Sequence, residues 1–289
     1  MAPTLVLFAD PLNPLGWIAE PIRRQVAMTY PALEWEVRPA GMVETWDAYD
    51  GPELPGGRAA VPAICARLRE THRMPLDEFL WFEDAPESSW PACRAVAAAG
   101  LQGSAAALGL LRAFRESTFV RCEPVDDEAT ITTAMGRVPG LDAEAVAAAL
   151  DDGTAEAAFA AARRAAAAVD APGVSRADNR CALPTLVVRD GSEPLGVTGL
   201  DDFAAVADVV EAGAGVEPAG SPPDPEAVLE RFSPEGWVTA AELAAITGRA
   251  PEDVVDDPSL EASGIVGSTF AGEPFWRLEA DVAVADDAE

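Results

Sequence analysis

Short apolar runs, separated by turn residues, predict the strands of a small mixed sheet. The first, Thr4–Phe8, ends at Asp10-Pro11, and an amphipathic stretch then predicts a helix to about Thr29. Leu33–Arg38 alternates as a second strand does, and a right-handed crossover would bring it beside the first. Two later runs, Leu183–Val188 and Leu195–Thr198, flank a turn at Gly191, and Leu200–Ala212 follows as a helix. The order predicts an α/β fold.

Between the second and third strands, helical periodicity predominates. Val61–Glu70 and Leu76–Trp81 fit short helices or extended pieces equally well. Ser88-Ser89-Trp90-Pro91 predicts the start of an Ala-rich helix, because serine caps and proline is tolerated in the first turn. Further helices are predicted over Leu101–Phe119, Asp142–Leu150 and Thr154–Val169. We therefore expect a helical insertion at about 60–170.

A Pro/Gly-rich stretch at 213–224 predicts a linker, so that residues 1–212 form one domain. Beyond it, helices are predicted over Pro225–Arg231, from the capping box Thr239–Glu242 to Gly248, and over Pro251–Val255. A hairpin of 264–270 and 274–278 completes the order of a small α+β, winged-helix-like module over 225–280. The acidic tail 281–289 is expected to fray.

Composition narrows the partners. The 289 residues carry a formal net charge of −29, and all 20 basic residues are Arg. Such a chain repels nucleic acid and anionic membranes, and residues 221–289 hold only three Arg against 16 Asp and Glu. A winged helix here is therefore expected to bind protein or dimerise. The acidic excess is most simply an adaptation to a salt-rich cytoplasm.

The side chains that bind metals are sparse. Cys65, Cys93, Cys122 and Cys181 are far apart in the sequence, and His72 is the single histidine. These spacings predict no zinc site, and we expect no cofactor. There is no signal-peptide pattern and no apolar run of 18 residues, so the sequence predicts a cytoplasmic protein without a membrane span.

The most informative stretch is Leu5–Ile18, in which a buried strand leads through a tight turn into a helix. The turn and helix start read Asp10-Pro11-Leu12-Asn13-Pro14-Leu15-Gly16-Trp17. Such a turn lies at the carboxyl edge of a sheet, where open α/β folds bind ligands. The frame resembles D-P-x-C-P-x-C-W of the DsbA-like thioredoxin superfamily, especially its FrnE-like and SpxH-like (YjbH) members.

The resemblance extends to Ser89–Phe119, which is similar to the helical insertion of that group, and to Ala182-Leu183-Pro184-Thr185-Leu186. The second stretch resembles the superfamily's cis-proline strand, which faces the redox motif. By that resemblance, a binding site would combine the Asp10–Trp17 segment with Leu183, Pro184 and Thr185. The expected groove is apolar, bordered by Leu12, Leu15 and Trp17.

The cysteine positions of the motif are occupied by Asn13 and Gly16, and neither side chain can act as a thiolate. No catalytic residue is therefore predicted. A relocated pair of thiols stays open, since Cys93 lies at a predicted helix start and Cys181 precedes Pro184. For the turn itself, a purely structural role and a binding role are both open.

The resemblance implies a redox-inactive adaptor that binds a protein client or peptide and presents it to a protease. A partner in extended conformation could pair with backbone groups beside Pro184. The alternative is an enzyme similar to kappa-class glutathione transferases and 2-hydroxychromene-2-carboxylate isomerases, with Asn13 in the slot of their single serine. A degenerate disulfide oxidoreductase or isomerase is the third possibility. The oligomeric state is left open.

The charge leads to a direct prediction. The protein should melt at a lower temperature in low salt than in molar salt, because its carboxylates then repel one another unscreened. Thermal unfolding followed by circular dichroism measures this. A melting temperature that does not change with salt would show that the acidic surface is not under electrostatic strain.

Overall fold

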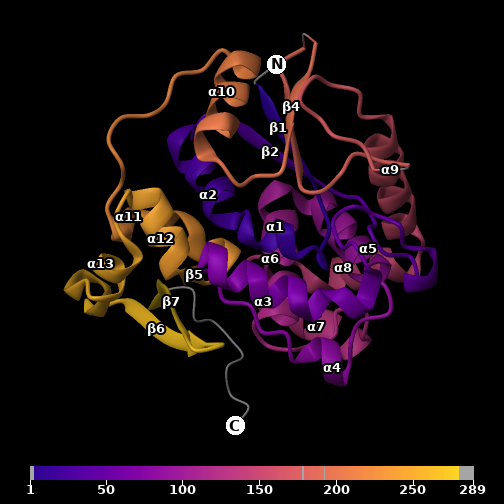
Figure 1. The fold of residues 1–289 in the computed structure, drawn as a ribbon, viewed down its shortest axis with the longest axis horizontal. Helices are drawn as coiled ribbons and strands as arrows, with labels where there is room; N and C mark the ends of the chain where they lie inside the picture. The colour runs from indigo at the N-terminus through magenta and orange to yellow at the C-terminus, as the bar shows by residue number, and fades with distance from the viewer. Residues whose placement is uncertain (1–2, 178, 192, 280–289) are drawn as a thin grey trace.

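A four-stranded mixed sheet forms the centre of the N-terminal part in the computed structural model, which describes residues 3–177, 179–191 and 193–279 (Figure 1). Its order is β2-β1-β3-β4. β1 (Thr4–Ala9) pairs parallel with β2 (Glu34–Pro39) and antiparallel with β3 (Thr185–Arg189). β4 (Leu195–Thr198) pairs antiparallel with β3. The four strands occur where the apolar runs predict them.

Helices pack on this sheet from several parts of the chain. α10 (Phe203–Ala214) packs against β3, β4 and α2 (Glu20–Thr29). α5 (Trp90–Ala99), α6 (Ser104–Phe119) and α9 (Thr154–Ala168) contact β2. The single helix predicted after β1 is two helices, because α1 (Pro14–Ile18) ends before α2 begins. Pro21, in the first turn of α2, has no N–H to continue the ladder of α1.

The rest of the region at about 60–170 is helical, as predicted. α3 (Val61–His72) resolves the first ambiguous segment as helix, whereas 76–81 is mostly irregular and leads into α4 (Leu80–Glu83). α7 (Glu128–Gly136) and α8 (Ala143–Asp151) complete the set. Single 3₁₀ turns lie at Trp46–Ala48, Gly57–Ala60, Gly100–Gln102, Ser233–Glu235 and Pro258–Glu261. No helix of the described residues has the length and apolar character needed to span a membrane.

The C-terminal part contains α11 (Pro225–Phe232), β5 (Val238–Thr239), α12 (Ala240–Thr247), α13 (Pro251–Val255), β6 (Ile265–Phe270) and β7 (Glu273–Leu278). Its three strands form an antiparallel sheet in the order β5-β7-β6. The predicted capping box is confirmed, since Thr239 and Glu242 cap α12 reciprocally. The acidic tail predicted at 281–289 lies outside the described residues.

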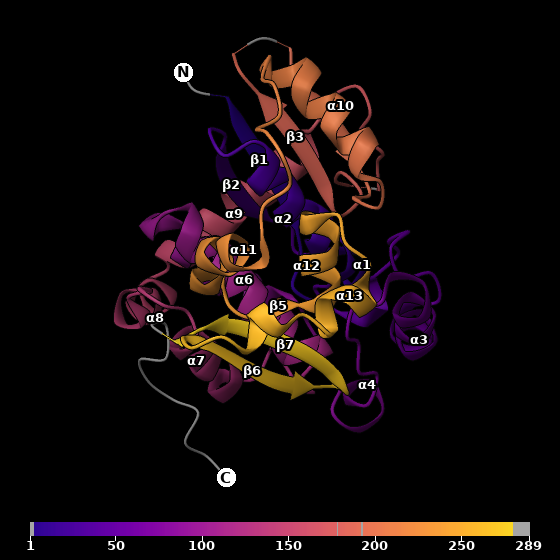
Figure 2. The same ribbon diagram turned by 90° about the vertical axis from the view of Figure 1, so that its left-hand side faces the viewer.

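This C-terminal module packs on the sheet-bearing part through α12, which contacts α2, and through the 3₁₀ turn at Ser233–Glu235, which contacts α6 (Figure 2). Buried ion pairs cross the contact. Arg23 of α2 binds Glu235 at 2.5 Å, and Arg112 of α6 binds Glu242 at 2.6 Å. Arg24 and Arg112 also both donate to the carbonyl oxygen of Trp237.

The ion pairs form one buried network that balances its own charge. Its members are four arginines and four glutamates, all with side chains at most 6% exposed: Arg23, Arg24, Arg112, Arg115, Glu20, Glu116, Glu235 and Glu242. Removing one partner from such a pair leaves an uncompensated buried charge, which typically costs about 3–5 kcal/mol. The network therefore fixes the position of the C-terminal module against α2 and α6.

Candidate functional site

The turn after β1 is shaped by the side chains of Asp10 and Asn13. The Asp10 carboxylate accepts hydrogen bonds from the backbone amides of Leu12 (2.9 Å) and Met42 (2.5 Å). Asn13 caps α1 by accepting from the amide of Leu15 at 3.0 Å. Pro14 takes the first helical position, where no N–H is needed. The turn is thus locked to the sheet on one side and to α1 on the other.

Asp10 is fully buried and also binds α5. Its second carboxylate oxygen accepts from the hydroxyl of Ser89 at 2.8 Å and from the thiol of Cys93 at 3.4 Å. Burial raises the pKa of Asp10, although the amides of Met42 and Leu12 oppose that shift. The carboxylate joins β1, the loop after β2 and the start of α5, so its role in the structure is to hold these segments together.

Gly16, at the position of the second motif cysteine, lies directly against the guanidinium of Arg115. A Cβ atom built at Gly16 would overlap Nη2 of Arg115. Arg115 is 1% exposed and ion-paired with Glu20, so it cannot swing away into solvent. Burial lowers the pKa of Arg115 to about 10 despite the attraction of Glu20, which leaves the group charged at neutral pH. The volume that a second thiol would need is occupied by a buried cation.

Trp17 belongs to the same buried layer. Its indole N–H donates to the carbonyl of Pro75 at 2.7 Å, its ring stacks on Phe119, and the guanidinium of Arg112 lies 4.3 Å from the ring centroid. A cation over an indole face is an attractive arrangement, especially where both are desolvated. Trp17 therefore anchors α1 to α6 and to the ion network.

Burial divides the predicted site residues sharply. Between Asp10 and Trp17, Leu15 is the one residue with a partly exposed side chain; the others are buried. The expectation that Leu12 and Trp17 border an open groove is wrong, because both are 0% exposed. Asn13 is equally buried, and its side-chain oxygen caps α1, so the side chain is not presented at the surface.

A groove of about 280 Å³ does lie beside the turn. Leu15 and Ile18 of α1 form one wall, and Leu183 and Pro184 form another. The Leu183–Pro184 peptide bond is cis. The remaining lining residues are not predicted as site residues from the sequence. They are Pro52, Glu53, Leu68, His72, Ala182, Thr198, Gly199, Leu200 and Asp201. No motif marks them, since they come together only in the folded chain.

The backbone beside Pro184 is not free, which corrects the expectation of strand pairing with a partner. The amide of Leu183 donates to the carboxylate of Glu53 at 2.9 Å, and the carbonyl of Pro184 accepts from Gly199. The hydroxyl of Thr185 donates to the carbonyl of Ala182 at 2.6 Å, so Thr185 is a buried internal contact. Glu53 is in turn held by Arg180 at 2.6 Å.

The four cysteines are free. Burial raises the pKa of Cys93 well above its usual value, and the neighbouring Asp10 carboxylate adds to that shift. Burial therefore outweighs any lowering of the pKa of Cys93 by its position near a helix N-terminus. Burial likewise raises the pKa of Cys181 to about 11 and that of Cys65 to about 12. Within the described residues, no three His, Cys, Asp or Glu side chains are grouped to hold a metal ion.

A βαβ unit joined to a ββα unit, with a modified redox turn and a cis-proline lining one groove, defines a thioredoxin-fold protein. Comparison with known proteins agrees. Residues 6–201 match a family model described as thioredoxin, and the chain belongs to this thioredoxin family.

One curated relative is the ClpXP adapter protein SpxH of Halalkalibacterium halodurans, 33% identical over 141 residues. The match covers 47% of this chain and 44% of that protein, so it spans less than half of the relative's length.

Two solved structures share the fold. A candidate protein disulfide isomerase from Nitrosomonas europaea has a TM-score of 0.58 and 21% identity, covering 73% of this chain and 97% of its own. Cytosolic disulfide reductase DsbM from Pseudomonas aeruginosa has a TM-score of 0.53 and 19% identity, covering 71% and 97%.

The contact between Gly16 and Arg115 predicts the effect of the smallest side chain. Gly16→Ala should lower the free energy of unfolding by about 1–3 kcal/mol, because overpacking must displace a buried, ion-paired group. Urea denaturation measures this. As a control, Gly136→Ala adds the same methyl group where nothing lies within 4 Å and should not destabilise the protein.

A double-mutant cycle identifies the cause. In an Arg115→Leu background the cost of Gly16→Ala should shrink, since the overlapping guanidinium is gone. An equal cost in both backgrounds would show that Arg115 does not restrict position 16.

Proposed function

We propose that this thioredoxin-fold chain is a redox-inactive adaptor that binds a protein client or peptide in the groove between Leu15 and Pro184. The proposal is supported by what occupies the two cysteine positions of the motif, Asn13 and Gly16. The side-chain oxygen of Asn13 caps α1, and the space beside Gly16 is filled by Arg115. The groove next to them has remained open and largely apolar in its walls.

The backbone hydrogen bonds beside Pro184 favour recognition through side chains. The amide of Leu183 and the carbonyl of Pro184 are already paired within the chain. An apolar side chain of a partner can instead insert between Leu15, Ile18 and Leu183, where burial of apolar area supplies the affinity. Peptide recognition through pockets for individual side chains is a common mode, and this groove suits one or two residues.

The adaptor assignment is supported by the relative named a ClpXP adapter protein. By that likeness, the chain would bring its client to ClpXP. The C-terminal module has the element order helix, strand, helix, helix, hairpin, for which we propose a winged-helix class. The acidity of residues 221–289 favours a protein partner for it and disfavours nucleic acid.

A thiol-dependent enzyme of the glutathione transferase type is less well supported. Such an enzyme needs a polar side chain at position 13 that faces the bound thiol. Asn13 is 0% exposed, and its side-chain oxygen is occupied by the amide of Leu15. The burial of Asn13 therefore favours the adaptor.

Affinity capture with a charged substitution tests the groove. Wild type, Leu15→Asp and Leu101→Asp are immobilised and exposed to salt-equilibrated lysate of the source organism, and the bound proteins are quantified by mass spectrometry. Leu101 is 59% exposed outside the groove, so its variant introduces the same charge on an apolar surface position elsewhere. The client should bind wild type and Leu101→Asp and be lost from Leu15→Asp, with ClpX among the proteins that wild type retains.

Circular dichroism and melting temperature establish that Leu15→Asp is folded, which is expected because Leu15 is partly exposed. The proposal fails if the folded Leu15→Asp variant captures the same proteins as wild type.

A further inference from the structure

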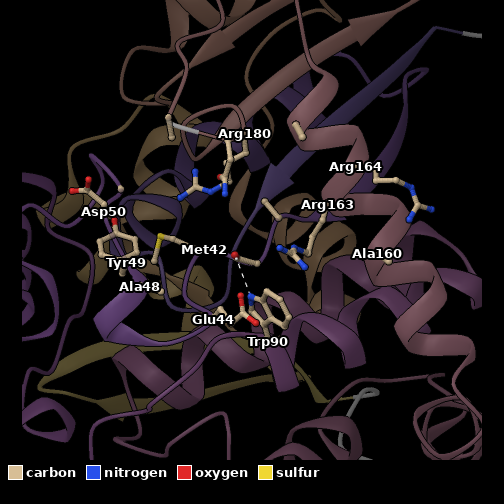
Figure 3. A pocket seen from close by; sticks show the side chains of 16 residues that line it. Met42, Glu44, Ala48, Tyr49, Asp50, Trp90, Ala160, Arg163, Arg164 and Arg180 are labelled. Atoms are coloured by element: carbon tan, nitrogen blue, oxygen red, sulfur yellow. Dashed lines mark hydrogen bonds between the residues drawn. The ribbon is translucent and has the colours of Figure 1, made fainter.

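A second, larger cavity lies on the other side of the loop that follows β2. Its volume is about 520 Å³, within the range typical of small-molecule sites. The loop 40–51 forms one wall, α9 forms another, and Ala177, Asn179 and Arg180 close the third (Figure 3). None of the Asp10–Trp17 turn lines it, so it is separate from the groove of the proposed function.

Three arginines line this cavity: Arg163, Arg164 and Arg180. That is a notable concentration in a chain with no Lys and a formal net charge of −29. Arg180 is neutralised by Glu53. Among the described residues, no carboxylate forms an ion pair with Arg163 or Arg164. Of these two, Arg163 points toward Trp90 and the cavity, whereas Arg164 projects to the other side of α9 (Figure 3).

Arg163 is held in place by aromatic contacts. Its guanidinium lies 4.0 Å from the centroid of the Trp90 ring, and Figure 3 shows it projecting from α9 toward that indole. Trp90 is fixed in turn, since its N–H donates to the carbonyl of Gly41 at 3.3 Å and its ring meets Phe159 edge to face. A guanidinium stacked on one face keeps its N–H edges free for a bidentate contact with a carboxylate or phosphate.

The opposite wall is equally fixed. Gly41 has a φ of +67°, and a Cβ there would lie 2.7 Å from the Phe159 ring. The loop therefore approaches α9 more closely than any other residue at position 41 would allow. This close approach keeps the carbonyl of Gly41 within hydrogen-bond distance of the Trp90 N–H. The indole ring on which Arg163 stacks is thereby held in place.

Two acidic side chains limit the charge of the ligand. Glu44 and Asp50 line the cavity and are exposed, so their carboxylates disfavour a ligand with many negative charges. A small molecule with one anionic group is repelled less and can bind at Arg163. The aromatic side chains of Trp90 and Tyr49, which also line the cavity, suit a ligand with a flat apolar part.

We infer that this cavity is a binding site for a small organic molecule that carries a carboxylate or phosphate group, with Arg163 as its main anion contact. The site is independent of the client groove, and neither assignment rests on the other.

Calorimetric titration at constant ionic strength tests the site with two matched probes, phenyl phosphate and benzoate, which share a ring and differ in the anion. Saturable binding of at least one probe to wild type is expected, and the tighter probe identifies the anionic group. Arg163→Gln should weaken that binding about tenfold or more, because a charge-assisted contact is lost.

Two further variants distinguish a specific site from general electrostatic attraction between the anionic probe and exposed arginines. Arg67→Gln removes the same charge from an exposed position on α3 and should change the affinity less than twofold. Ala160→Glu places a carboxylate on the α9 wall, three residues before Arg163, and should abolish binding without removing any arginine. Failure of wild type to bind either probe, or equal weakening by Arg163→Gln and Arg67→Gln, would overturn the inference.

Discussion

The position of the Arg115 guanidinium against Gly16 is the constraint on which the rest of the structure depends. A buried cation needs a partner, and Glu20 supplies it from the start of α2. Glu20 is held ionised in spite of its burial, since Arg23 and Arg115 bring its pKa down to about 2. Arg23 then reaches Glu235 of the C-terminal module. The same network of charges thus fills the space beside Gly16 and holds the C-terminal module in place.

Buried ion pairs are seldom the most stable choice, because well-packed apolar residues of the same volume often do as well or better. Their effect here is positional. The pairs of Arg23 with Glu235, of Arg24 and Arg112 with Glu242, and of Arg115 with Glu20 form only when α2, α6, α12 and the 3₁₀ turn at Ser233–Glu235 lie in this arrangement. Arg112 also covers the face of Trp17. We interpret the network as the device that gives the module a single position. Its cost is that a side chain at position 16 would have to displace the buried guanidinium of Arg115, which disfavours a dithiol site.

Much of the fold could be predicted from local patterns, and much of the site could not. Apolar runs located all four strands of the central sheet, and the capping box at Thr239 marked the start of α12. The pattern also marks the turn from Asp10 to Trp17 but not its burial, because Trp17 is covered by Phe119 and Arg112 of α6 and bonded to Pro75, all far along the chain. Glu53 shows the same limit. It binds both Arg180 and the amide of Leu183 across 127 and 130 positions, and no spacing in the sequence indicates that.

We propose that the thioredoxin fold has been kept in this chain while its thiol chemistry has been lost. Reduction of insulin disulfides in the presence of dithiothreitol, followed by turbidity, measures that chemistry. We expect a rate equal to that of dithiothreitol alone, since Asn13 and Gly16 provide no thiol and burial raises the pKa of Cys93 and Cys181. A rate above that background, abolished by Cys93→Ser or Cys181→Ser, would contradict it.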